Sequence, residues 1–250
     1  SHISSPDRTG TGTMVSCVAS IAGTVMLAYV QMGAELKYLL AASFMSAPGG
    51  LLMAKMIMPD EDIVPGVKEK RLVMESSQHE NVILAAAVGA ADGVKLAVNI
   101  AAMLVAFVAL IALFNGLVGG LAGLVGVEGL TLQKMLGWLF SPIMFLLSIP
   151  WTEAQAAGAL FGEKVILNEF VAFSHMTDYL AGMSEKTHAI VTVALCGFAN
   201  LSSIAILLGG LGSLVPEKRE LIARFGIKAV AAGSLSNLMS AALAGILLSI

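Results

Sequence analysis

Residues 162–173 read GEKVILNEFVAF, and this stretch places a carboxylate, Glu169, inside an apolar run. An ionisable side chain in a bilayer costs about 2.5–3.5 kcal/mol and usually faces a functional site or a water-filled cavity. The polar pair Asn168-Glu169 divides the run 154–173 into two arms, each shorter than the ~20 residues that a membrane-spanning helix needs. The stretch therefore predicts a re-entrant helical hairpin, with its tip at Asn168-Glu169 and near the middle of the membrane.

The composition indicates that lipid is the solvent for most of the chain. Of the 250 residues, 57% are hydrophobic and only 12% are charged, and the mean hydropathy is +0.87. Soluble domains average about 25% charged residues. The net charge of −3 gives no indication of nucleic-acid binding. We therefore expect an all-α polytopic membrane protein.

Two apolar runs have polar residues in their middle. The run 14–30 contains Ser20, and the run 187–214 contains Asn200. Polar groups and unwound backbone at membrane depth occur where they are buried in protein or line a cavity. We expect both runs to form broken transmembrane helices.

The remaining apolar runs are expected to flank these elements. The run 36–58 contains Pro48, which lacks a backbone donor and predicts a break or kink. The run 82–114 would extend ~50 Å as a helix, so it is expected to tilt strongly or to leave the membrane. Residues 130–149 have the pattern of an interfacial helix, and 227–250 are the last expected span.

An internal similarity and the distribution of basic residues indicate an inverted repeat. Residues 18–22 (VASIA) resemble 201–205 (LSSIA), and each lies in an apolar run with a polar centre. Repeated halves with broken helices that meet at mid-membrane are common in secondary transporters. We expect half of such a core, with its two equivalent turns on opposite sides of the membrane. The positive-inside tendency supports this, with Lys37 outside and the clusters Lys68, Lys70, Arg71 and Lys218, Arg219, Arg224 inside.

The chain has no pattern typical of an enzyme. Its four histidines, at positions 2, 79, 175 and 188, lie in no metal-ligand or catalytic motif. Cys17 and Cys196 lie in apolar runs, far apart and without metal-like spacing. We therefore expect neither an enzyme nor a resident cofactor.

Hydrogen-bonding groups in apolar surroundings are the candidates for a binding site. A carboxylate, an amide and hydroxyl groups suit a sugar-like solute, because each pairs with solute hydroxyls. A hydroxyl together with carbonyls freed by a broken helix suits sodium. The alternative interpretation is that such groups only join helices, each contributing about 0.6–2 kcal/mol. The candidate residues for this binding site are Ser20, Thr24, Asn168, Glu169, Asn200 and Ser203.

At these residues the chain resembles the C-terminal domain of the concentrative nucleoside transporters. The resemblance rests on residues 19–25 (ASIAGTV), 46–48 (SAP), 162–172 (GxKxxxNEFVA) and 196–204 (CGFANLSSI), and it extends from about Met14 to Ile250. It implies a mobile transport domain of hairpins and broken helices that moves against a trimeric scaffold.

The resemblance also implies roles for particular residues. The expected nucleoside-binding residues are Val25, Glu169, Phe198, Asn200 and Ser203. Ser20, through its hydroxyl, and Ile21, through its carbonyl, are expected to contribute to a sodium site. The expected function is sodium-coupled nucleoside uptake by a homotrimer in the inner or plasma membrane.

The N-terminal part of the chain departs from the family pattern. The family's first hairpin, which binds the nucleobase, and the preceding scaffold helices are expected upstream of residue 14, where residues 1–13 instead form a polar lead-in. We therefore predict a division into 1–13 and a membrane domain 14–250. Two alternatives stay open: proton-coupled nucleoside symport, and a membrane fragment that does not transport.

Overall fold

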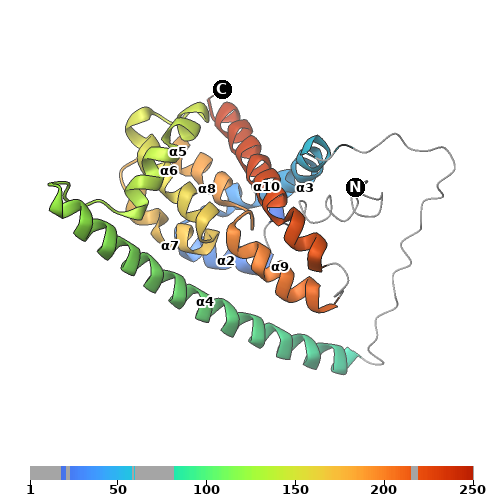
Figure 1. Ribbon diagram of the computed structural model, residues 1–250. Helices are drawn as coiled ribbons and strands as arrows, with labels where there is room; N and C mark the ends of the chain where they lie inside the picture. Colours follow the sequence, from blue (N-terminus) through green and yellow to red (C-terminus); the bar gives the residue numbers. More distant parts are fainter. Residues whose placement is uncertain (1–17, 21–22, 58, 60–81, 215–218, 250) are drawn as a thin grey trace. The chain divides into compact units, whose positions relative to one another are not determined.

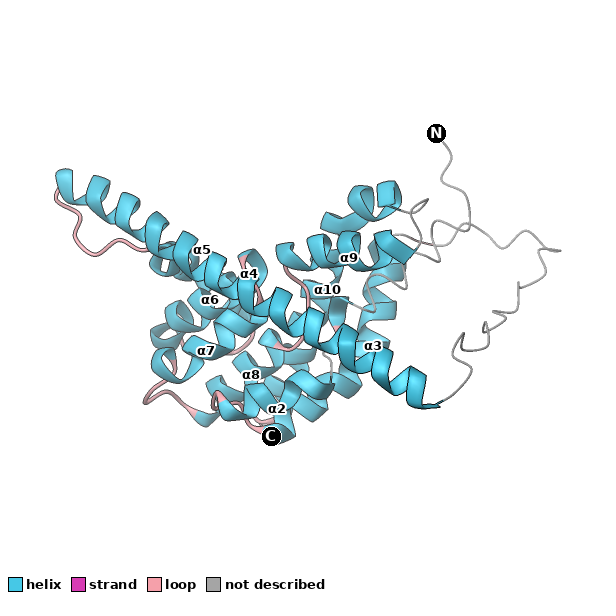
Figure 2. Ribbon diagram, turned by 90° about the horizontal axis from the view of Figure 1, so that it is seen from below, coloured by secondary structure: helices cyan, strands magenta, loops and turns pink. Residues whose placement is uncertain are grey.

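The computed structural model describes residues 18–20, 23–57, 59, 82–214 and 219–249. Within these residues all regular secondary structure is helical and no strand occurs (Figures 1 and 2). This confirms the predicted all-α class. The chain divides into two compact units, 62–129 and the remainder. The predicted boundary at residue 14 lies outside the described residues, and so does Ile21, which the sequence resemblance predicts for a sodium site.

The larger unit is built from short and long helices. Helical backbone at Val18 and Ala19 ends at the bend of Ser20, and this interruption is the first helix break. The helices of this unit are α2 (Gly23–Gln31), α3 (Leu36–Ile57), α5 (Leu132–Leu146), α6 (Trp151–Ile166), α7 (Glu169–Tyr179), α8 (Glu185–Leu195), α9 (Leu201–Leu214) and α10 (Arg219–Leu247). In the smaller unit the described residues include the long helix α4 (Val82–Leu124).

Among the described residues, three helical stretches are long and apolar enough to cross a membrane: Leu36–Ile57, Val105–Leu124 and Ala223–Leu247. Helices α5 and α6 are bent by 118° and would count as a fourth span if taken together. The chain is therefore a multi-pass membrane protein, as its composition predicts.

Two sequence expectations about helix boundaries need correction. The sequence predicts a break or kink at Pro48, and the structure has no break there, since helix α3 is continuous from Leu36 to Ile57. Its buried residues on either side of Pro48 belong to one helix that packs against α10 and α8, and this packing outweighs the loss of one backbone hydrogen bond. Helix α4 extends ten residues beyond the expected end at 114, because its glycines are tolerated within a long apolar helix.

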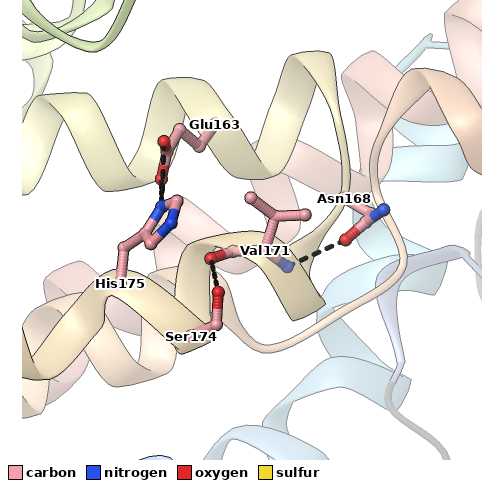
Figure 3. Close-up of polar contacts among 5 residues, drawn as sticks. All are labelled: Glu163, Asn168, Val171, Ser174 and His175. Atoms are coloured by element: carbon pink, nitrogen blue, oxygen red, sulfur yellow. Dashed lines mark hydrogen bonds and ion pairs between the residues drawn. The ribbon is translucent and has the colours of Figure 1, made fainter. Parts of the chain in front are cut away.

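The predicted hairpin is present, and its tip lies where the sequence places it. Helix α6 ends at Ile166 and α7 begins at Glu169. Asn168 caps α7, since its side-chain oxygen accepts a hydrogen bond from the Val171 amide at 2.9 Å. Across the two arms, Glu163 on α6 contacts His175 on α7 at 3.0 Å (Figure 3).

Close helix packing holds the hairpin in the larger unit. Helices α5 and α6 approach each other at Gly137 and Gly158, where a Cβ on Gly158 would lie 2.8 Å from the Gly137 carbonyl oxygen. The main apolar cluster contains residues of α2, α3, α5, α6, α7, α8 and α10. At its centre the rings of Tyr29 and Phe173 stack with their centroids 4.2 Å apart. The hairpin is thus packed on helices far from it in the sequence.

The predicted break in the run 187–214 is also present. Helix α8 ends at Leu195 and α9 begins at Leu201, with irregular backbone between them. Gly197 in this gap has a φ of +129°, a conformation that glycine adopts far more readily than other residues. The gap brings polar residues against the tip of the hairpin.

Candidate functional site

Glu169 is the centre of the candidate site. It is the first residue of α7, it is only 4% exposed, and its two carboxylate oxygens have different partners. Asn200 Nδ2 donates to Oε2 at 2.6 Å, and the Tyr29 hydroxyl donates to Oε1 at 3.1 Å. The hairpin tip, the α8–α9 break and α2 therefore converge on one buried carboxylate. Buried charges need such partners, because removal from water is costly.

Asn200 is held by hydrogen bonds that fix the orientation of its amide. Its Oδ1 accepts from the Ser203 amide and from the Ser202 hydroxyl, both at 2.7 Å. The first of these contacts makes Asn200 the cap of α9. Because the oxygen faces two donors, the amide nitrogen must face Glu169. The Ser203 hydroxyl in turn donates to the Asn200 carbonyl at 2.7 Å.

The two helix breaks are in contact through their backbones. The amide of Phe198, in the α8–α9 break, donates to the carbonyl of Ser20 at 3.2 Å. Both residues are half-buried. This contact brings the expected ion-binding stretch beside the stretch that carries Asn200. It joins two segments that are almost 180 residues apart in the sequence.

Val25 lies on α2, one helical turn before Tyr29. It is half-buried and packs against the main apolar cluster. Residues four apart share one face of a helix. Val25 is therefore on the same face of α2 as the hydroxyl group that contacts Glu169.

Three residues of this region are not among the candidates predicted from the sequence. One of them is Tyr29, although a tyrosine hydroxyl in an apolar run generally has a buried partner. Lys164 and Asn237 are buried and hydrogen-bonded to each other at 2.8 Å. Lys164 belongs to the motif quoted above, but its partner on α10 follows from the tertiary structure alone.

The site has the chemistry of ligand binding. It combines a carboxylate that accepts hydrogen bonds with amide and hydroxyl groups that donate them. Within the described residues, no group of three or more His, Cys, Asp or Glu side chains could hold a metal ion. Broken helices that meet at buried polar groups, in a multi-pass membrane protein, define the membrane-embedded domain of a transporter.

Comparison with known proteins agrees with this class. The family described as Na+ dependent nucleoside transporter C-terminus matches residues 38–245. The chain is 50% identical over 239 residues to "Nucleoside permease NupC" of Helicobacter pylori, covering 93% of this chain and 56% of that protein. It is 36% identical over 249 residues to "Sodium/nucleoside cotransporter 1" of Oryctolagus cuniculus, covering 94% of this chain and 38% of that protein.

A solved structure has the same fold. The "Structure of CNTnw in an inward-facing substrate-bound state" superimposes with a TM-score of 0.87 at 49% identity, covering 97% of this chain and 58% of that one. The chain thus belongs to the Na+ dependent nucleoside transporter family, and it matches the C-terminal part of that family. It spans 56% of the length of the Helicobacter permease. These relatives are transporters and permeases, which confirms the prediction that the chain is not an enzyme.

Proposed function

We propose that the protein containing this chain takes up nucleosides by alternating access, as a secondary symporter of the inner or plasma membrane. The observation that carries the proposal is the buried Glu169 carboxylate, which lies where the hairpin tip meets a broken helix and has donors from Tyr29 and Asn200. The names of the relatives support nucleosides as the transported class.

Glu169 and Asn200 suit the two neighbouring hydroxyls of a ribose. A carboxylate accepts from hydroxyl hydrogens, whereas the Asn200 amide nitrogen donates to a hydroxyl oxygen. Hydrogen bonds to an ionised group are roughly twice as strong as neutral ones, so the ribose side would contribute strongly to affinity. Ser203, Phe198 and Val25 are the other proposed contacts. In this interpretation the bound nucleoside exchanges hydrogen bonds with groups that now pair with each other.

Sodium is the proposed coupling ion. The Ser20 hydroxyl and the Ile21 carbonyl are the proposed ligands, because carbonyl groups freed in discontinuous membrane helices coordinate sodium. If sodium and nucleoside both favour the same closed site, each raises the affinity of the other by the same factor. We further propose a homotrimer for the full-length protein. Light scattering of the detergent-solubilised protein would test the trimer, and a monomeric mass would contradict it.

The test is uptake of radiolabelled uridine and adenosine into proteoliposomes that contain the full-length protein. Each nucleoside is measured with an inward sodium gradient, with an inward proton gradient in the absence of sodium, and with no gradient. We expect accumulation with the sodium gradient alone. The same reconstitution with Ser20→Ala should require more sodium for half-maximal uptake, because a hydroxyl ligand is lost.

The other outcomes identify the alternatives. Accumulation with the proton gradient alone would replace sodium by proton coupling in the same fold. An unchanged sodium titration in Ser20→Ala would remove Ser20 from the ion site. No uptake and no nucleoside binding under any gradient would overturn the nucleoside site and favour a membrane protein that does not transport.

A further inference from the structure

Lys164 is a buried cation whose role the proposed function leaves unexplained. It lies on α6, it is 0% exposed, and the ring of Phe161 is 5.4 Å from its ammonium nitrogen. The ammonium donates to Asn237 Oδ1 at 2.8 Å and to the Ala194 carbonyl at 3.4 Å. Lys164 lies five residues before Glu169 in the same hairpin. Burial of a charged group is unfavourable unless the group is paired and hydrogen-bonded, so a cation here requires a specific arrangement around it.

Asn237 continues this arrangement from α10. It is 3% exposed, and because an ammonium can only donate, its oxygen must face Lys164. The amide nitrogen is thereby turned to the opposite side, where it donates to the carbonyl of Ala19 at 3.0 Å. Ala19 is the last helical residue before Ser20, at the first helix break. Lys164 and Asn237 therefore connect the hairpin to the proposed ion-binding stretch.

The second helix break packs against the same asparagine. A Cβ on Gly197 would lie 2.6 Å from the Ala19 carbonyl oxygen and 2.8 Å from each of the two polar atoms of the Asn237 side chain. Ala194, which accepts from Lys164, is in the last turn of α8 before this break. Both unwound stretches and the first arm of the hairpin thus meet at Lys164 and Asn237.

We propose that Lys164 and Asn237 are positioning residues that link the nucleoside site to the Ala19-Ser20 stretch, so that binding at one orders the other. The inference rests on the proposed function, and it adds the residues through which the two sites act on each other. Both residues act through others: Lys164 through Asn237, and Asn237 through the backbone carbonyl of Ala19.

A purely structural role makes a different prediction. Truncation of one partner leaves a buried polar group unpaired and destabilises the fold, whereas replacement of both by apolar groups of similar shape is often nearly neutral. The double variant Lys164→Met/Asn237→Leu keeps the side-chain shapes and removes both connections. Ser240→Ala is the matched control, since Ser240 is a buried polar residue one turn along α10 whose hydroxyl bonds to its own helix at Ser236.

The experiment is amide hydrogen exchange of the full-length protein, with and without uridine. In the wild type and in Ser240→Ala we expect uridine to slow exchange both in peptides covering 196–203 and in peptides covering 18–24. In the double variant we expect uridine to protect 196–203 still, and the protection of 18–24 to fall at least about fivefold. Thermal unfolding in detergent, measured in parallel, confirms that the double variant is folded.

Three outcomes would overturn the inference. Equal protection of 18–24 in the wild type and in a folded double variant assigns the pair a structural role only. Protection of 196–203 alone in the wild type shows that the two stretches are not linked. Protection of neither stretch in the wild type removes the nucleoside site itself, and the proposed function fails together with the inference.

A sodium titration of uridine uptake gives a second readout. The double variant should raise the half-saturating sodium concentration about tenfold. Because the coupling is reciprocal, it should raise the KM for uridine at saturating sodium by about the same factor, whereas uridine binding without sodium should change by less than about twofold. A tenfold change corresponds to about 1.4 kcal/mol of coupling, within the usual range for linked sites. If the double variant is folded and its sodium titration matches that of Ser240→Ala, the inference is contradicted.

Discussion

Glu169 and Glu163 are both buried glutamates of one hairpin, but their surroundings differ. Glu163 is paired with His175 across the two arms, and its partner is on the neighbouring helix of the same hairpin. Glu169 is paired with neutral groups from α2 and from the α8–α9 break. A contact within the hairpin stabilises the hairpin itself, whereas neutral donors from other elements can be exchanged for ligand hydroxyls. This difference is the reason for assigning ligand binding to Glu169 and hairpin stability to Glu163.

Substitution of these two residues should therefore have separable effects. In Glu169→Gln, the loss of a hydrogen bond to a charged group removes about 1.5–3 kcal/mol. We expect the KM for uridine uptake to rise about 10- to 100-fold. In Glu163→Gln we expect less folded protein and a lower unfolding temperature, with the KM of the folded fraction unchanged. An unchanged KM in Glu169→Gln would remove this residue from the nucleoside site.

At the scale of elements, the α8–α9 break depends on a single backbone conformation. Gly197 combines a positive φ with close contacts to Ala19 and Asn237. Gly182, between α7 and α8, also has a positive φ of +77°, but a Cβ there would meet nothing within 4 Å. A comparison of substitutions at these two glycines therefore distinguishes the effect of backbone strain from the effect of the close approach of the two breaks.

Gly197→Ala and Gly182→Ala make a matched pair. Each alanine is strained at positive φ, at a cost of about 1–3 kcal/mol, and should lower the unfolding temperature. Only Gly197→Ala places a methyl group between the two breaks, so only this variant should lose uridine uptake, by at least about tenfold. The measurement is uptake normalised to folded protein. Equal uptake by the two variants would show that the close approach of the breaks is unimportant for transport.

At the scale of the whole molecule, the polarity is the reverse of that in a soluble protein. Large apolar side chains are exposed on α3, α4, α5 and α10, whereas Glu163, Lys164, Glu169, Asn200 and Asn237 are buried. In lipid, exposed apolar groups carry no penalty, and polar groups must find partners inside the protein. The membrane thus supports the buried polar network that the proposed function requires.

Arginine substitutions in α4 test this arrangement. Leu113 is 59% exposed near the middle of the span Val105–Leu124, and Leu124 is 84% exposed at its end. An arginine at the centre of a span costs about 2.5–3.5 kcal/mol, whereas one at the end extends into the headgroup region. We expect Leu113→Arg to reduce the alkali-resistant, membrane-inserted fraction at least about threefold, and Leu124→Arg to leave it near the wild-type level. Equal insertion of both variants would place this helix outside the membrane.

Residue types and their local order were sufficient to predict much of the fold and part of the candidate site. Asn168 and Glu169 in the middle of an apolar run predicted the tip of the hairpin, because an asparagine caps the following helix and neither arm is long enough to span. Asn200 in a polar-centred run predicted the second helix break for a similar reason. Both signals lie within a few residues of the feature that they predict.

The remaining features depend on contacts between residues far apart in the sequence. Pro48 predicted a break or kink, yet no break occurs, because α3 packs on α10 and α8 as one continuous helix. Tyr29 lies 140 residues from Glu169, and Asn237 lies 218 residues from Ala19. Periodicity and composition indicate whether a residue is exposed to lipid and which residues it contacts within its own helix. They carry no information on which distant residue becomes the partner of a buried polar group. The sequence by itself thus determined the membrane class, the hairpin and the carboxylate at its tip. Only the tertiary structure decided which groups surround that carboxylate, because a buried polar group is paired by whichever helices pack against it.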